Sequence, residues 1–230
     1  MSLTVIGGNV SPYVRKLRVF LAEKDVAYEL DPVSPFAPPE GFRELSPLGK
    51  IPALRDGDRI VNDSSVICAY LERMHPQPPL YPSDPYNCAR AQWLEEYAGG
   101  GLVAAAGPKV FFPLVLAPLM SGKEPDEAPA LRAAAEDLPP FYDYLEGQLG
   151  GRVEDQPGDR DYFVGGRLSI ADIAVASPFV NLRHAGVAPE RARWPALRAF
   201  LDGMYARPSF KACIEEETPI YGKRAALVTD

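Results

Sequence analysis

The sequence contains little cysteine and little histidine, and this scarcity excludes several kinds of site. Its 230 residues include three cysteines and two histidines. Cys68, Cys88 and Cys213 are widely spaced, so they predict neither a disulfide framework nor a zinc site. We therefore expect no bound metal, and a reducing, cytoplasmic location is the natural expectation.

The chain also lacks an excess of basic charge and an unbroken apolar run. Lysine and arginine number 24 against 31 acidic residues, and the net charge of -7 disfavours binding to a nucleic acid backbone. The most apolar stretch, residues 102–120, is interrupted by Gly107, Pro108 and Pro113 and is not expected to span a membrane. The start, MSLTVIGG, lacks the charged and apolar regions of a signal peptide. We expect neither a nucleic acid partner nor a membrane.

The first 75 residues contain the signals of a small mixed sheet with helices on its faces. Residues 3–6 form a short apolar run that ends at Gly7-Gly8, which is typical of a buried strand. Ser11-Pro12 predicts a helix start, because serine is a common N-cap and proline is favoured at the first helical position. The later segments predict a strand at 27–30, a proline-rich loop, a hairpin of strands 52–55 and 59–61, and a helix at 64–74.

The remainder of the chain predicts a linker and a helical domain. Five prolines lie between Pro76 and Pro85, a composition typical of a linker between domains. Beyond it there is no strand alternation, and helices are predicted at about 85–120, 127–149, 169–185, 193–206 and, briefly, 209–214. The predicted organisation is an α/β domain at 1–75, a linker at 76–85 and an all-α domain at 86–230.

Three segments of the first domain could accept a small charged ligand. Ser11 lies at a helix start, where unpaired backbone N–H groups favour an anion such as a thiolate; the alternative is that it only caps the helix. Ile51-Pro52 enters a strand, where a cis bond would expose the backbone of Ile51 to an extended peptide. Asp63-Ser64 forms a second helix start. No serine lies in a G-x-S-x-G motif and no glycine-rich nucleotide motif is completed, so hydrolase and nucleotide-binding interpretations are weak.

Together these segments resemble the glutathione transferase family. The resemblance rests on Ser11-Pro12-Tyr13, on the Gly49-Lys50-Ile51-Pro52 turn, on Asp63-Ser64 with the helix after it, and on residues 163–172 and 194–197 of the helical part. It covers nearly the whole chain in the right order. The serine-type classes, such as tau, phi and theta, fit best, because the first strand has no tyrosine and no cysteine lies near Ser11.

The resemblance implies a fold, an activity and partners. The fold is an α/β thioredoxin-like N-terminal domain followed by an all-α C-terminal domain. The activity is that of a detoxifying glutathione transferase, in which the glutathione thiolate attacks a small apolar electrophile. The implied cofactor is glutathione as co-substrate, and the implied assembly is a homodimer. The alternative is a non-catalytic member of the family that acts as a binding or scaffolding protein.

The resemblance also implies a role for each site residue. Ser11 would donate a hydrogen bond to the glutathione thiolate. Ile51, before a cis Pro52, would pair its backbone with the cysteinyl moiety. Asp63 would bind the γ-glutamyl ammonium group, and Ser64 with its helix start would bind the γ-glutamyl carboxylate.

Two departures from the family pattern concern the ends of the glutathione molecule. Asp63 stands where the family usually has glutamate, and its side chain is one methylene shorter. The resemblance places Lys50 where it would contact the glycyl carboxylate or the nearby backbone. The loop 31–42 has no lysine or histidine, which several classes use for the glycyl end, and Arg43 could substitute for that missing residue.

Two further groups of charged residues have structural interpretations. Ser169 and Asp172 stand three apart at a helix start, which predicts a reciprocal cap rather than a ligand site. In a two-fold dimer, Glu72, Arg73 and Arg90 could meet opposite charges across the axis, or they could be ordinary solvated residues.

Overall fold

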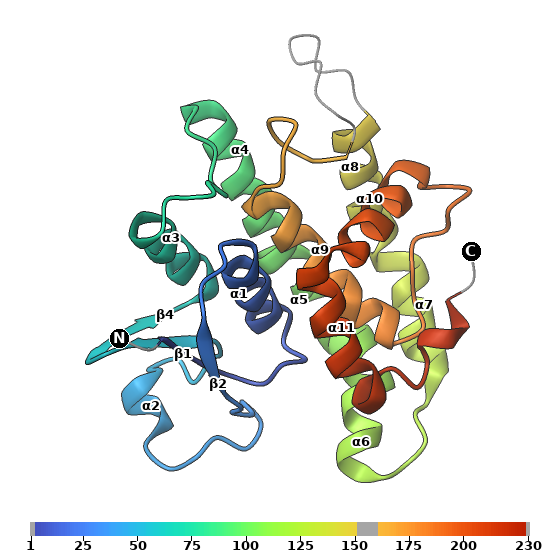
Figure 1. Cartoon of the computed structure of the whole chain (residues 1–230). Helices are drawn as coiled ribbons and strands as arrows, with labels where there is room; N and C mark the ends of the chain where they lie inside the picture. Colours follow the sequence, from blue (N-terminus) through green and yellow to red (C-terminus); the bar gives the residue numbers. More distant parts are fainter. Residues whose placement is uncertain (1–2, 151–160, 229–230) are drawn as a thin grey trace. The chain divides into compact units, whose positions relative to one another are not determined.

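The computed structural model describes residues 3–150 and 161–228. The chain divides into two compact units, Met1–Tyr81 and Pro82–Asp230, and each is described by itself (Figure 1). The expected linker, 76–85, spans this division, and residues 76–81 belong to the first unit.

The first unit is built on a four-stranded mixed sheet with the strand order β2-β1-β3-β4. Strand β1 pairs in parallel with β2 and antiparallel with β3, and β3 and β4 form a hairpin. The element bounds are β1 Leu3–Ile6, α1 Pro12–Glu23, β2 Tyr28–Asp31, α2 Phe42–Leu45, β3 Ala53–Asp56, β4 Arg59–Asn62 and α3 Ser64–Met74. The predicted strands and long helices are all present. The short helix α2 is additional, since no helix is predicted in that segment.

Both faces of the two central strands, β1 and β3, are buried where these strands pair at Val5–Ile6 and Ala53–Leu54. Successive side chains of a strand point to opposite faces, so the paired residues Val5 and Leu54 lie on one face and Ile6 and Ala53 on the other. All four are at most 2% exposed. Ile6 and Ala53 pack with Phe42 of α2, while α1 and α3 pack against each other. Because side chains on both faces of β1 are buried, its sequence is a continuous apolar run rather than an alternating pattern.

The second unit is all-helical within the residues that the structure describes. A long run begins with α4 Pro85–Glu96 and continues through the π-helical segment η1 Tyr97–Leu102, α5 Val103–Ala106, the π-helical segment η2 Gly107–Leu116 and α6 Ala117–Ser121. The later elements are α7 Glu127–Asp137, α8 Pro139–Gly150, α9 Ile170–His184, α10 Pro195–Ala206, α11 Pro208–Tyr221 and the 3-10 turn η3 Ala225–Leu227. The two-part fold confirms the predicted class.

Helix α9 is the centre of this unit. Every one of its residues except Arg183 is buried, and it contacts α4, η1, η2, α10 and α11. Helix α11 is longer than the sequence predicted, because it continues to Tyr221 and carries Pro219 inside its last turn.

The run from Pro85 to Ser121 is long and apolar enough, by length and composition, to cross a membrane. In the structure it packs against α7 and α9. Pro113 lies inside η2, where its lack of a backbone N–H removes one helical hydrogen bond.

Candidate functional site

The register of the sheet brings three of the predicted ligand segments to one end of the first unit. Ile6, the last residue of β1, is paired with Ala53, the first residue of β3. Ala53 is in turn paired with Asn62, the last residue of β4. The segment after β1, the segment before β3 and the segment after β4 therefore leave the sheet at the same end of these strands.

Gly7 allows two of these segments to approach closely. Its φ is +152°, and a Cβ at this position would lie 2.7 Å from Cγ2 of Val14 and 3.0 Å from Cβ of Ile51. Any larger residue would push Ile51 away from the end of β1. The bond between Ile51 and Pro52 is cis.

Ser11 is the N-cap of α1. Its Oγ accepts a hydrogen bond from the N–H of Val14 at 3.4 Å, and Pro12 occupies the first helical position. The hydroxyl proton is not used by this bond. Because the side chain is only half-buried, a ligand thiolate at the helix N-terminus could still accept that proton.

Asp63 and Ser64 form the start of α3. The Asp63 Oδ1 accepts hydrogen bonds from the N–H groups of Ser65 at 2.9 Å and Val66 at 3.2 Å, and the residue has a positive φ of 72°. Its carboxylate is therefore already engaged as a helix cap, although Oδ2 takes part in neither bond. Ser64 is buried.

Lys16 is a residue of this region that the sequence analysis missed. It lies in α1, it is 5% exposed, and its Nζ donates a hydrogen bond to Oγ of Ser65 at 3.0 Å. This contact brings a buried positive charge to the N-terminus of α3. The only sequence signal was a lysine among apolar residues of a predicted helix face.

Lys50 is exposed, and its side chain makes no hydrogen bond or ion pair with the residues that the structure describes. Its backbone is held by Ser46, whose Oγ donates to the carbonyl of Lys50 at 2.7 Å and accepts from its N–H at 3.2 Å. Arg43 donates to the carbonyl of Pro47 and lies close to Gly49. The structure thus places two cations near the cis-proline turn.

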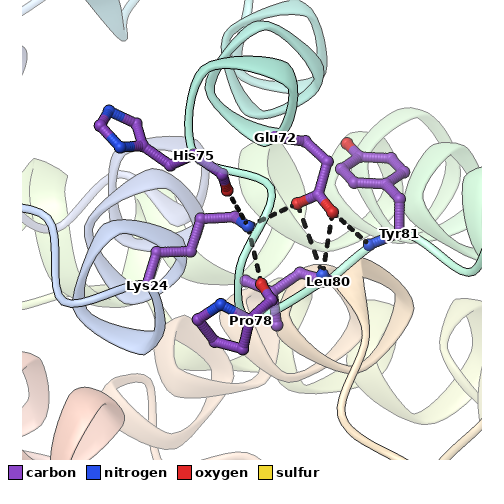
Figure 2. Close-up of polar contacts among 6 residues, drawn as sticks. All are labelled: Lys24, Glu72, His75, Pro78, Leu80 and Tyr81. Atoms are coloured by element: carbon purple, nitrogen blue, oxygen red, sulfur yellow. Dashed lines mark hydrogen bonds and ion pairs between the residues drawn. The ribbon is translucent and has the colours of Figure 1, made fainter.

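A second polar cluster lies at the other end of α3 and involves a buried lysine (Figure 2). Nζ of Lys24 donates to the carbonyls of His75 at 2.7 Å and Pro78 at 2.8 Å and forms an ion pair of 2.7 Å with Glu72. Glu72 also accepts from the N–H groups of Leu80 and Tyr81. The side chain of Lys24 is fully buried.

This cluster corrects the interpretation of Glu72 as a dimer-interface or solvated charge. A carboxylate with an internal cation and two internal N–H donors is used within its own subunit. Arg90 donates to Gln148 inside the second unit, whereas Arg73 is exposed.

Asp172 and Ser169 form a capping box at the start of α9. The Asp172 carboxylate accepts from the N–H of Phe163 at 2.8 Å, the N–H of Ser169 at 2.7 Å and the hydroxyl of Ser169 at 2.9 Å. Full burial raises the pKa of Asp172 to about 7, although these hydrogen bonds act in the opposite direction.

His184 has a role that the sequence did not indicate. Nε2 of His184 lies 3.0 Å from Oε2 of Glu217, and both side chains are at most 1% exposed. Glu217 comes from α11, so the pairing depends on the packing of two helices.

The comparisons with known proteins agree with this architecture. Residues 6–79 match the model of the glutathione S-transferase N-terminal domain, and residues 102–208 match that of the C-terminal domain. The chain belongs to the glutathione transferase family. These matches do not identify the serine-type subclass.

Among the similar proteins, some are named as stringent starvation protein A homologs and others as glutathione S-transferases. The chain is 26% identical over 220 residues to a stringent starvation protein A homolog of Pasteurella multocida, covering 94% of this chain and 92% of that protein. A glutathione S-transferase structure from Rhodospirillum rubrum is 26% identical, with a TM-score of 0.84 and coverage of 99% and 100%. A Methylobacterium radiotolerans glutathione S-transferase, in complex with glutathione sulfonate, is 30% identical, with a TM-score of 0.73 and coverage of 93% and 95%.

Proposed function

We propose that this protein is a glutathione transferase in which Ser11 stabilises the thiolate of bound glutathione for attack on an apolar electrophile. The observation that carries the proposal is the convergence of Ser11, the cis-proline turn and the start of α3 at one edge of the sheet. Family membership and the glutathione sulfonate complex of a relative support it.

The energetics of thiolate stabilisation are within reach of these groups. Lowering a thiol pKa by about two units requires roughly 2.7 kcal/mol. A hydrogen bond from the Ser11 hydroxyl to the thiolate supplies about 1.5–3 kcal/mol. The N-terminus of α1 adds roughly 0.3–1 kcal/mol. Together, these two contributions are of the size that such a pKa shift requires.

The rest of glutathione would bind along the same edge. The backbone of Ile51 would pair with the cysteinyl moiety, as an added strand pairs with a sheet edge. Ser64 and the N-terminus of α3 would bind the γ-glutamyl carboxylate, and the buried charge of Lys16 would strengthen that site. Oδ2 of Asp63 would contact the ammonium group, and Lys50 would contact the glycyl carboxylate.

The experiment separates catalysis by Ser11 from its role as a helix cap. Glycine is nearly as good an N-cap as serine, so Ser11→Gly would remove the hydroxyl with a loss of only a few tenths of a kcal/mol. We expect the rate of conjugation to a chlorodinitrobenzene to fall at least tenfold and the pKa of the bound thiol to rise. Ser11→Thr, which keeps a hydroxyl, is the control. An unchanged rate and pH profile in Ser11→Gly would reject the proposed mechanism.

A second candidate is a non-catalytic member that binds or scaffolds other proteins. Two observations favour it: the Asp63 carboxylate is already a cap, and a full-length relative is named as a stringent starvation protein A homolog. Calorimetric titration with glutathione distinguishes the two functions. Saturable binding with conjugation supports the enzyme, and a folded protein that shows neither supports the alternative.

We also propose a cytoplasmic homodimer. Light scattering at low micromolar concentration should give about twice the chain mass of 25.1 kDa. A particle with the mass of one chain would refute the dimer.

A further inference from the structure

Asn62, the last residue of β4, is attached to the chain on both sides of the cis-proline turn. Its backbone is paired with Ala53, which directly follows the cis Pro52. Its side-chain Nδ2 donates a hydrogen bond of 3.1 Å to the carbonyl of Leu45, the last residue of α2. The segment 46–52 therefore begins and ends next to groups that the same asparagine holds.

The segment between these two attachments is closed on itself. Oγ of Ser46 bonds both the N–H and the carbonyl of Lys50, and the N–H of Gly49 donates to the carbonyl of Ser46 at 2.7 Å. Gly49 has a positive φ of 65°, which glycine adopts without steric cost. Because these bonds are internal, they fix the shape of the segment but not its place against the sheet.

Apolar contacts also hold the segment, but they do not orient it. Leu45 before it and Ile51 within it pack against the buried cluster that contains Phe42 and Ala53, and such contacts are non-directional. The last carbonyls of a helix have no partner within the helix. The hydrogen bond from Asn62 gives the Leu45 carbonyl a partner and fixes the direction in which the chain enters the segment.

The hydrogen bonding of Asn62 itself is incomplete. Its Oδ1 is buried and has no hydrogen-bond partner in the part of the chain that the structure describes. The reverse orientation of the amide would set Oδ1 against the Leu45 carbonyl, and neither oxygen can donate. An unsatisfied buried acceptor costs at least as much free energy as one neutral hydrogen bond typically contributes. Stability therefore does not account for an asparagine at this position, where leucine would fill a similar volume without an unsatisfied oxygen.

We propose that Asn62 is a positioning residue for glutathione. Through the Leu45 carbonyl it holds the segment 46–52 where the backbone of Ile51 can pair with the cysteinyl moiety. Asp63, the next residue, begins the site for the γ-glutamyl end, so one asparagine sets the distance between the two sites. This role rests on the proposed function, and Asn62 acts through these groups rather than on the thiol.

Asn62→Leu removes the hydrogen bond together with the unsatisfied oxygen. We expect the Kd for glutathione in calorimetry, and the KM for glutathione in conjugation, to rise about fivefold or more. The kcat at saturating glutathione and its pH profile should be unchanged because Ser11 is untouched, and the melting temperature should not fall. An asparagine with only a structural role would give the opposite result, a lower melting temperature with an unchanged KM.

Two further variants separate the hydrogen bond from the shape of the side chain. Asn62→Asp keeps the size but replaces the donor with an acceptor, so it should weaken glutathione binding at least as much as Asn62→Leu. Tyr70→Phe is the matched control, because it removes the 2.6 Å hydrogen bond from Tyr70 to Asp56, which lies at the other end of β3 from Ala53. This control should leave the glutathione affinity unchanged.

Hydrogen exchange measured without glutathione tests the attachment directly. The amides of Gly49 and Lys50 should exchange about tenfold faster or more in Asn62→Leu than in the unsubstituted chain. Unchanged exchange, or unchanged glutathione affinity in the variant, would reject the role of Asn62 and leave the proposed function standing. If the unsubstituted chain did not bind glutathione, the proposed function would fail and this role would fail with it.

Discussion

Replacing Asp172 with alanine would remove the acceptor of three hydrogen bonds at the start of the most buried helix. Loss of an N-terminal cap costs about 0.5–2 kcal/mol. The N–H groups of Phe163 and Ser169 would also lose their acceptor, and an unsatisfied buried donor costs about 1–3 kcal/mol. Burying a carboxyl group is itself unfavourable, so removing it offsets part of this loss. We expect the free energy of unfolding to fall by about 2–4 kcal/mol at pH 5.5.

The pH dependence has a definite sign. The pKa of Asp172 is about 7 in the folded protein and about 3.9 in an unfolded chain. The folded state therefore binds the Asp172 proton more tightly than the unfolded chain does. The stability gained from this protonation is greatest below pH 4 and declines as the pH rises to 7. The cost of Asp172→Ala should be smaller at pH 7.5 than at pH 5.5.

Urea unfolding followed by circular dichroism measures both effects. The matched control is Asp126→Ala, because Asp126 is the N-cap residue of α7 but its side chain makes no capping hydrogen bond. The control should change stability by less than about 0.5 kcal/mol. If Asp172→Ala had no larger effect than the control, or if turnover per folded molecule collapsed while stability was kept, the structural role of Asp172 would be wrong.

Three other substitutions test separate parts of the structure. Lys24→Met should lower the free energy of unfolding by about 3–5 kcal/mol, because it leaves the Glu72 carboxylate without its cation. In chemical unfolding, the double variant Lys24→Met with Glu72→Gln should recover part of this loss, and no recovery would count against a stabilising Lys24–Glu72 ion pair. Asp63→Glu should cost about 1 kcal/mol of capping energy but lower the Kd for glutathione about tenfold. Weaker binding of glutathione in calorimetry would show that Asp63 already contacts the γ-glutamyl ammonium group. Tyr142→Phe should raise the unfolding free energy by about 1 kcal/mol, since its buried hydroxyl has no partner among the described residues; a lower melting temperature would contradict this.

Local signals in the sequence were sufficient for most of the elements. Ser11-Pro12 and Ser169 with Asp172 mark helix starts through chemistry that depends on neighbouring residues only. The alternation and spacing of apolar residues predicted the strands and the long helices for the same reason. The family resemblance then gave the fold, which periodicity by itself does not specify.

Pairings between distant segments could not be predicted in this way. His184 and Glu217 lie 33 residues apart, and only the packing of α9 on α11 brings them together. Lys16 meets Ser65 through the contact of α1 with α3. A buried lysine and an exposed one look alike in a sequence, so neither Lys16 nor Lys24 could be recognised as an organising residue before the fold was known.

The cluster around Lys24 also determines where this chain can be divided and recombined. Composition alone would place a crossover point for domain exchange at the start of the proline-rich stretch, near residue 75. A chimera joined there would take its next six residues from another parent, yet Lys24 and Glu72 bind the backbone of Pro78, Leu80 and Tyr81. These contacts are to main-chain groups and tolerate changes of side chain, but they require the path of the native segment. Hybrids joined after Tyr81 would inherit an intact first unit, which makes that residue the natural boundary for exchanging helical domains within the family.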